Sequence, residues 1–336
     1  MNGPEVMGAR LVRRTLRLHR PVVTAHGPVG DREVLLLGLS DAEGNIGWGE
    51  AAPLPVFTPE TVDEAGQAIL DWLDDDRIQP PATPTARAAV DGALLPLAAR
   101  AAGLPLHRHL DPHSPSSFAV SALVTGDSPE ELVATARTAV DAGHRTVKVK
   151  VGALSFEVDL ALVAALRDAV GPEVAIRLDA NGAWDPDEAP GYLERLAGLG
   201  IEFVEDPVAG VEALAAVRTA SPVPIAADET ATSPEGVAAV LEAGAADIVV
   251  LKPSAVGRIV VAAELAAIAR DAGLGVVVTS LLDGAVGVSH AAHLASAIGA
   301  LHPAPGLGTS ALVAEDVGTP PRLEGGFLLL SGEDGP

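Results

Sequence analysis

Residues 175–205 read AIRLDANGAWDPDEAPGYLERLAGLGIEFVE. The segment holds a β-rich run at 175–179, a helical stretch at 187–199 that ends at Gly200, and a second β-rich run at 202–205. A strand, a helix and a strand in this order predict one β/α unit of a parallel sheet.

The same alternation extends over most of the chain from about residue 118 onward. The β-rich runs cover residues 118–123, 147–151, 175–179, 202–205, 224–228, 248–252 and 276–280, with a weaker run at 301–305. Between them lie helical stretches that include residues 129–142, 156–170, 187–199, 234–243, 258–272 and 285–298. Eight strands at this spacing predict an α/β fold of the (β/α)8 type, a modified TIM barrel. An open doubly wound sheet is the alternative, and it is disfavoured because no Gly-rich dinucleotide loop follows any strand.

The first hundred residues have a different pattern. Extended runs at 10–20, 33–40 and 45–49 are followed by helical stretches at 61–74 and 85–102. We therefore predict an α+β capping domain over residues 1–105 and a catalytic β/α barrel over residues 106–313. The tail, residues 314–336, returns to extended patterns and is expected to pack back on the capping domain.

Composition excludes several classes of function. The absence of cysteine excludes disulfides, thiolate metal sites and cysteine nucleophiles. A net charge of −23 argues against nucleic acid or an anionic membrane as a partner. The apolar runs are shorter than the roughly 20 residues that a membrane helix needs, and the N-terminus lacks the apolar core of a signal peptide. We expect a cytoplasmic protein that binds a small molecule, and a homo-oligomer is left open.

Lysine is rare, and its positions are informative. Only three of the 22 basic residues are lysine, namely Lys148, Lys150 and Lys252. They fall in the second and sixth predicted strands. A lysine can lose its proton near neutral pH when it is buried or close to another cation, whereas an arginine effectively cannot. We therefore expect the three lysines to take part in catalysis, with Lys148 lowering the pKa of Lys150.

Three successive predicted strands end in a carboxylate, at Asp179, Glu205 and Asp228. The carboxyl ends of the strands form the active site of TIM barrels. Converging carboxylates repel one another unless a cation lies between them, and oxygen ligands suit Mg²⁺ or Mn²⁺. The alternative is that each residue caps the helix that follows it, which we would favour for one strand but not for three in a row.

The lysines flank this predicted metal site. Lys150 lies one strand before Asp179, and Lys252 lies one strand after Asp228. This arrangement suits removal of a proton next to a substrate carboxylate, with the metal holding that carboxylate and stabilising the enediolate.

A set of motifs at the strand ends resembles the enolase superfamily, and within it the muconate-lactonising subgroup. The motifs are Lys148-x-Lys150, Asp179-x-Asn181, Glu205-Asp206-Pro207, Asp228-Glu229 and Lys252-Pro253. The resemblance extends over nearly the whole chain. It implies that the three carboxylates bind the metal, that Lys150 is the acid/base on one face of the substrate, and that Lys252 is the opposing lysine.

Further motifs are similar to those of the o-succinylbenzoate synthase family of menaquinone biosynthesis. They are residues 48–55 (WGEAAPLP) with Phe57 and Glu60-Thr61, residues 147–152 (VKVKVG), Arg177-x-Asp179-x-Asn181 and Pro305-Gly306-Leu307. This likeness implies a metal-dependent lyase that dehydrates a cyclohexadiene carboxylate. Lys150 would take the α-proton and then protonate the departing hydroxyl, while Lys252 would stay protonated. Residues 53–61 are expected to close over the barrel mouth. The candidate substrate-binding residues are Arg177, Asn181, Ser280, Gly306, Leu54 and Phe57.

Two segments depart from the related families. Residues 279–284 read TSLLDG, where the synthases commonly have a Ser-rich stretch with Glu, and residues 306–309 read GLGT, where dipeptide epimerases have Asp-x-Asp. The second departure disfavours dipeptides. Racemisation of an N-acyl- or N-succinylamino acid stays open, as does another muconate-cycloisomerase-like reaction. A Schiff-base aldolase and a barrel without catalytic activity are disfavoured by the three carboxylates and the intact lysines.

Overall fold

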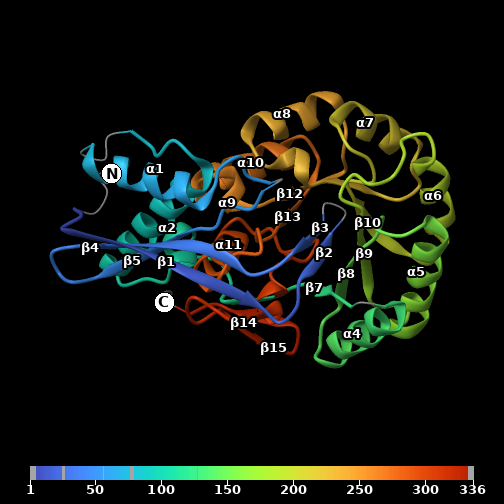
Figure 1. Cartoon of the computed structure of the whole chain (residues 1–336), viewed down its shortest axis with the longest axis horizontal. Coiled ribbons are helices and arrows are strands. Elements are labelled where there is room, and N and C mark those ends of the chain that lie inside the picture. Colours follow the sequence, from blue (N-terminus) through green and yellow to red (C-terminus); the bar gives the residue numbers. More distant parts are fainter. Residues whose placement is uncertain (1–4, 25–26, 56, 76–78, 127, 332–336) are drawn as a thin grey trace.

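The computed structural model describes residues 5–24, 27–55, 57–75, 79–126 and 128–331. Residues 1–4, 56 and 332–336, which belong to the predicted capping domain, capping segment and tail, lie outside this description. Figure 1 shows the N-terminal strands and helices, in blue and cyan, beside a barrel of strands and helices. Within the described ranges, no helix is long and apolar enough to cross a membrane.

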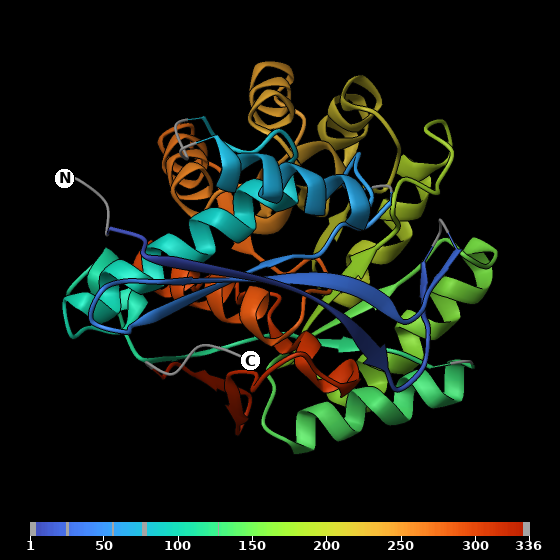
Figure 2. The same ribbon diagram turned by 60° about the vertical axis from the view of Figure 1, so that its left-hand side comes forward.

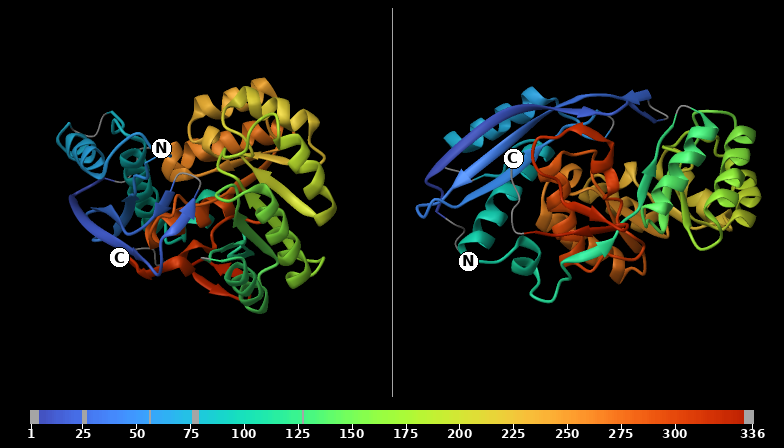
Figure 3. Two further views of the ribbon diagram at one scale, coloured as in Figure 1. Left: turned by 45° about the vertical axis from the view of Figure 1, so that its right-hand side comes forward. Right: turned by 90° about the horizontal axis from the view of Figure 1, so that it is seen from below.

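The barrel is built on a curled parallel sheet, seen in Figure 3. In the described chain its strand order is β13-β12-β11-β10-β9-β8-β7, and every neighbouring pair is parallel. The strands are β7 (Ala122–Val124), β8 (Thr146–Lys150), β9 (Ala175–Asp179), β10 (Ile201–Glu205), β11 (Ile225–Ala227), β12 (Ile248–Leu251) and β13 (Gly275–Val278). The sheet confirms the predicted barrel-type fold.

Two of the eight predicted strands need correction. The run at 301–305 is not a strand, because Pro303 and Pro305 have no N–H to donate to a ladder. Instead, Gly306 forms a single parallel bridge with Thr279 at the end of β13. The run at 118–123 is divided between two sheets, since β6 (Ser117–Ala119) pairs with the C-terminal tail and only β7 belongs to the barrel.

Helices cover the outside of the sheet, as Figures 1 and 3 show. They are α4 (Pro129–Asp141), α5 (Phe156–Val170), α6 (Ala189–Leu196), α7 (Val211–Ala220), α8 (Pro234–Ala243), α10 (Ile259–Asp271) and α11 (Ala285–Ala297), with the short α9 (Pro253–Val256) directly after β12. The predicted helical stretches match these helices within two residues at each end, except that α6 ends three residues earlier than predicted, and the structure adds α7 and α9. Apolar side chains between helices and sheet form the main core, and Phe203, Val250 and Val277 pack together in a separate apolar cluster contributed by the barrel strands.

The capping part is an antiparallel sheet with helices on one face. Its strand order is β14-β1-β4-β5, and β2 pairs with β3 in a separate hairpin. The elements are β1 (Gly8–Leu18), β2 (Val22–Thr24), β3 (Gly27–Val29), β4 (Arg32–Ser40), β5 (Ile46–Ala51), α1 (Val62–Asp74) and α2 (Pro84–Ala101), followed by the short α3 (Leu106–Leu110). Thr61 and Glu64 form a capping box that begins α1.

Strand β4 is apolar on both faces because both faces are buried. Leu35 and Leu37 pack against the residues of α1 and α2. Val34 and Leu36 pack with Val286 of α11 on the other side. Figure 2 shows the capping strands lying in front of α11, and this helix is buried over nearly its whole length.

The C-terminal tail divides between the capping sheet and a small separate sheet. Strand β14 (Val313–Glu315) pairs with β1 of the capping sheet. Strand β15 (Arg322–Glu324) instead pairs with β16 (Phe327–Leu329), and β16 pairs with β6. Only the start of the tail therefore joins the capping sheet, and the domain boundaries at residues 105 and 313 stay predictions.

The capping part supplies the N-caps of two barrel helices. Asp91 of α2 accepts hydrogen bonds from the backbone N–H groups of Ile259 and Val260, at 2.8 and 3.4 Å, at the start of α10. Glu50 of β5 accepts from Gly284 at 2.7 Å and Gly287 at 2.9 Å, at the start of α11. The first N–H groups of a helix have no partner within the helix. By accepting hydrogen bonds from these groups, the two carboxylates fix the orientation of the capping part relative to the barrel.

Candidate active site

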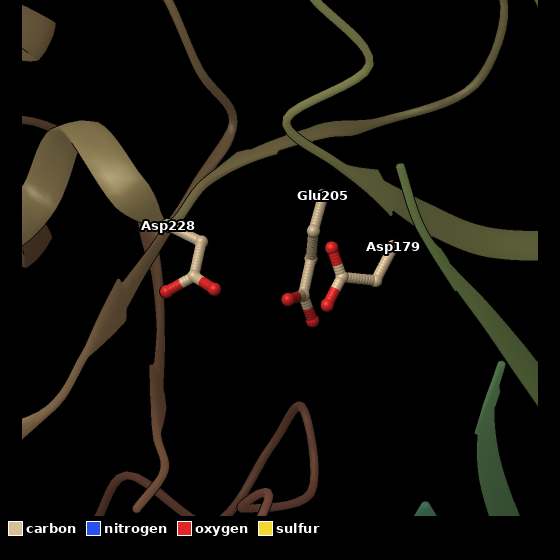
Figure 4. Close-up of side chains that lie close together, drawn as sticks. All are labelled: Asp179, Glu205 and Asp228. Atoms are coloured by element: carbon tan, nitrogen blue, oxygen red, sulfur yellow. The ribbon is translucent and has the colours of Figure 1, made fainter. Parts of the chain in front are cut away.

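Three carboxylates converge at the carboxyl edge of the sheet. Asp179 and Glu205 end the neighbouring strands β9 and β10, and Asp228 directly follows β11. All three side chains are buried, and one oxygen of each lies within 4.8 Å of the others (Figure 4). The donors are carboxylate oxygens only, which are the ligands that Mg²⁺ prefers. The residues therefore fit a hard divalent cation.

The three lysines contact this carboxylate cluster. Lys148 Nζ forms ion pairs with Asp179 Oδ2, at 2.8 Å, and with Glu205. Lys150 Nζ also donates to Asp179 Oδ2, at 2.8 Å. Lys252, the residue after β12, pairs with Asp228. Lys150 and Lys252 thus approach the cluster from strands that lie on opposite sides of it in the sheet.

Burial and neighbouring charges act against each other on these groups. Burial lowers the pKa of Lys148, but Asp179 and Glu205 together raise it more, so the net shift is upward. Burial raises the pKa of Asp179, but Lys148 and Lys150 outweigh it and hold this pKa below its usual value. Burial, and after it Lys148, lowers the pKa of Lys252 to about 7. Lys148 therefore keeps its proton, whereas Lys252 can exchange one near neutral pH.

A pocket opens over the cluster, and the capping part contributes to its lining. Apart from the lysines and the cluster carboxylates, its lining is mostly apolar or hydroxyl-bearing. The lining residues of these kinds are Val22, Val29, Leu54, Phe57, Leu123, Leu281, Leu282, Ser121, Thr279, Ser280 and Thr309. The ring centroid of Phe57 lies 4.6 Å from Lys252 Nζ, so this aromatic side chain lies directly beside the reacting region.

Four of the six candidate substrate-binding residues line this pocket. Leu54 and Phe57 come from the capping part, and Ser280 and Gly306 come from the barrel. Asn181 is not part of the lining. Its Oδ1 accepts from Lys150 Nζ at 2.7 Å and its Nδ2 donates to Glu229 at 2.5 Å. Asn181 therefore orients Lys150 without lining the pocket itself.

Arg177 requires a correction, because it does not line the pocket. It is 1% exposed, and its guanidinium donates to Glu202 Oε2 and to the carbonyl of Ala304, both at 2.6 Å. It precedes Asp179 by two residues on the same face of β9, which places it about 6.6 Å nearer the amino end of the strand. At that depth it packs 4.7 Å from the ring centroid of Phe203 and cannot bind substrate.

Several pocket residues were missed by the sequence analysis. Ser121 and Leu123 lie next to or in the first barrel strand, and attention to the end of that strand would have identified them. Val22 and Val29 come from the β2–β3 hairpin, 90 or more residues away from the barrel strands in sequence. Only the Gly27-Pro28 turn signal indicates that hairpin, and nothing local indicates that it reaches the barrel mouth.

Comparison with known proteins identifies the family to which the chain belongs. Residues 131–336 match the family model "Enolase C-terminal domain-like", and residues 6–88 match "MenC, N-terminal domain". The first match spans more than half of the chain. The chain belongs to the enolase superfamily, as the strand-end motifs predicted.

Individual relatives catalyse different reactions. The chain is 32% identical over 299 residues to the L-Ala-D/L-Glu epimerase of Bacillus subtilis (strain 168), covering 83% of this chain and 81% of the relative. It is 42% identical over 206 residues to the o-succinylbenzoate synthase of Thermobifida fusca (strain YX), covering 61% and 63%. Relatives of both kinds are enzymes, so the comparisons support an enzyme of this superfamily without selecting one substrate.

A solved structure bears on the cofactor. The dipeptide epimerase of Enterococcus faecalis V583, complexed with Mg and the dipeptide L-Leu-L-Tyr, is similar with a TM-score of 0.89 at 26% identity, over 97% of each chain. Together with the family match and the cluster of Asp179, Glu205 and Asp228, this confirms the prediction of a Mg²⁺ cofactor.

Proposed function

We propose that the chain is an o-succinylbenzoate synthase, which removes the proton α to a carboxylate and expels a hydroxyl from a cyclohexadiene carboxylate. The products are water and an aromatic succinylbenzoate. The MenC-type N-terminal match and the 42% identity to a synthase support this proposal. A small-molecule carboxylate is thus the proposed partner. A cytoplasmic location and a homo-oligomer stay predictions.

The observation that carries the proposal is the character of the pocket. A dipeptide has an ammonium group that needs an acceptor when it is buried. Among the described lining residues, the only carboxylates are Asp179 and Asp228 of the metal cluster. The remaining lining consists of apolar side chains, hydroxyl groups and Gly306, which suit a flat hydrocarbon ring better than a charged amine.

The proposed roles follow from the geometry of the site. Asp179, Glu205 and Asp228 would hold Mg²⁺, which when bound would fix the substrate carboxylate and stabilise the charge that develops on it. Lys150, oriented by Asn181, would accept the α-proton and return a proton to the departing hydroxyl on the same face. Lys252, whose pKa is lowered to about 7, would act in its protonated form on the opposite side, favoured there by the negative charge that develops on the substrate.

A second function is favoured by one observation. Lys150 and Lys252 contact different carboxylates, Asp179 and Asp228, at the two sides of the cluster. Two lysines on opposite faces of an α-carbon allow racemisation, in which one removes the proton and the other delivers one. The likeness to an epimerase over 83% of the chain agrees with such a reaction. An N-acyl- or N-succinylamino acid, which has no free ammonium, would suit the pocket described above.

The test is a parallel assay of the purified chain with Mg²⁺. The cyclohexadiene precursor, a panel of N-acylamino acids and L-Ala-L-Glu are compared by kcat/KM. We expect the precursor to give the highest value. A kcat/KM for an N-acylamino acid or the dipeptide that exceeds it by about tenfold would overturn the synthase proposal and leave the superfamily assignment intact.

Lysine variants separate the two mechanisms on the same substrates. Lys150→Arg keeps the charge but cannot act as a base near neutral pH, so it should abolish dehydration. Lys252→Arg keeps the cation that dehydration needs and should retain measurable dehydration activity. Under racemisation both variants should abolish interconversion, as measured by chiral separation of the product, while each variant should still exchange the α-proton in D₂O for only the enantiomer that faces its remaining lysine.

A further inference from the structure

Arg32 is a buried arginine of the capping sheet that reaches the rim of the pocket. It is the first residue of β4 and is 7% exposed. Its guanidinium donates to the carbonyls of Leu281 at 2.6 Å and Leu282 at 2.7 Å, in the loop after β13. It also donates to the carbonyls of Ala52 at 2.6 Å and Pro53 at 3.1 Å, in the loop after β5. One side chain therefore joins two loops that are more than 220 residues apart in sequence.

Both of these loops line the pocket. Leu54 directly follows the carbonyls on the capping side, and Leu281 and Leu282 carry the carbonyls on the barrel side. Leu54 and Leu281 also pack together in one small apolar cluster, with Phe57 against it. The four hydrogen bonds of Arg32 therefore join the same two sides of the pocket that this apolar cluster joins.

One of the four carbonyls belongs to a residue in an unfavourable backbone conformation. Leu282 has a φ of +53°, in the left-handed region that a bulky L side chain rarely adopts. Such a conformation persists only where the surrounding structure enforces it. The hydrogen bond from Arg32 to the carbonyl of Leu282 is a direct means of enforcement, and Leu282 itself contacts the pocket.

Two buried carboxyl groups, those of Asp283 and Glu50, lie close to Arg32 and hold the same barrel loop. Asp283 accepts from Ser254 Oγ at 3.0 Å and from the backbone of Leu281 at 2.9 Å. Glu50 accepts from the backbone of Gly284 at 2.7 Å. Both carboxylates are close enough to raise the pKa of Arg32, against the effect of burial. An arginine in an apolar interior without such neighbours would be strongly destabilising.

We propose that Arg32 is a positioning residue that sets the shape of the substrate pocket. It does so by holding the loop after β5 (the capping loop) and the loop after β13 (the barrel loop) in a fixed position relative to each other. It touches neither the carboxylate cluster nor the lysines, so it acts on the part of the substrate remote from the metal. The proposal rests on the proposed function only in assuming that a carboxylate substrate fills this pocket.

The first test is amide hydrogen exchange, which needs no substrate. Arg32→Met removes the donors, and Arg32→Lys keeps the charge but cannot reach all four carbonyls with one ammonium. The matched control is Arg167→Met, because Arg167 also donates to four carbonyls, at the opposite end of the barrel from the pocket: Leu199, Gly171, Val174 and Gly200. The reporter amides are Leu54 and Leu281, each hydrogen-bonded within its own loop, and Gly284, which donates to Glu50 of β5.

We expect both Arg32 variants to speed exchange at the reporter amides of both loops by about tenfold or more, and Arg167→Met to leave them within about twofold. Faster exchange in one loop only, or in neither, would overturn the proposal. If Arg32→Met does not fold, the lysine variant decides the outcome alone.

The second test is kinetic and uses the best substrate from the parallel assay. Arg32→Lys should raise KM by about tenfold, while the Mg²⁺ concentration for half-maximal activity stays within about twofold, and Arg167→Met should change neither. An unchanged KM, or an equal rise in the control, would contradict a positioning role. A chain inactive on the cyclohexadiene precursor would overturn the proposed function, while the exchange experiment would still decide the role of Arg32.

Discussion

Glu205 and Glu202 lie on the same strand but in different surroundings. Glu205 belongs to the carboxylate cluster, whereas Glu202 pairs with Arg177 outside the pocket. Because the cluster offers three ligand side chains, Glu205→Gln should weaken Mg²⁺ binding by at least about tenfold and reduce α-proton exchange in parallel. Titration with Mn²⁺ measures the binding directly. Glu202→Gln is the control, and a similar loss in that variant would indicate a general effect on strand β10 instead.

The sequence predicted the carboxylates and lysines because they end strands with a regular period. It failed for Arg177, because alternation along a strand tells which face a side chain is on but not how deep it lies. It also missed Arg32, whose partners are backbone carbonyls. A carbonyl is present at every residue, so the sequence contains no signal for the loops that this arginine joins.

At the level of the elements, the N-terminus of α11 donates hydrogen bonds to a carboxyl group of β5, that of Glu50, whose pKa is strongly raised. Burial, and then the neighbouring Asp283, raises the pKa of Glu50 to about 8 from its ordinary 4.5, although Gly284 and Gly287 donate to it. Between these pH values the folded chain binds more protons than the unfolded chain, so the free energy of unfolding falls as pH rises through this window.

Glu50→Gln should therefore flatten this pH dependence, because glutamine cannot ionise. The measurement is the melting temperature of Glu50→Gln and of the wild type at several pH values across the window from 4.5 to about 8. We expect the melting temperature of the wild type to fall relative to that of Glu50→Gln toward the upper end of this pH window, so that any advantage of the wild type shrinks or reverses there. Parallel curves would mean that Glu50 stays ionised throughout, with its charge stabilised by the helix N-terminus.

The elements themselves were predicted well where the apolar pattern is clear, as in the helical stretch of α5 and the continuous apolar run of β4. The closing strand was predicted wrongly because the run at 301–305 is apolar enough for a strand but contains two prolines. The division of the run at 118–123 depends on a tail more than 200 residues away, since β6 pairs with β16. Such long-range pairing is not encoded in local sequence patterns.

For the whole molecule, Asp91 links the stability of the capping part to that of the barrel. Asp91→Ala removes the N-cap of α10 and the ion pair with Arg258. We expect the free energy of unfolding to fall by about 1–2 kcal/mol, and exchange at the Ile259 amide to speed accordingly. Asp71→Ala, at an exposed position of α1, is the control and should have little effect. Unfolding of the barrel at an unchanged denaturant concentration would contradict the link.

The caps that Glu50 and Asp91 provide also bear on how such chains diversify. A gene exchange that replaced the first hundred residues with those of a relative would remove the N-caps of α10 and α11 and the four hydrogen bonds of Arg32 at once. The recombinant would lose the stability that these contacts supply unless the incoming segment carried equivalent acids and an equivalent arginine. We therefore expect new specificities in this lineage to arise more readily by stepwise substitution on both sides of the contact between the capping part and the barrel than by exchange of intact segments.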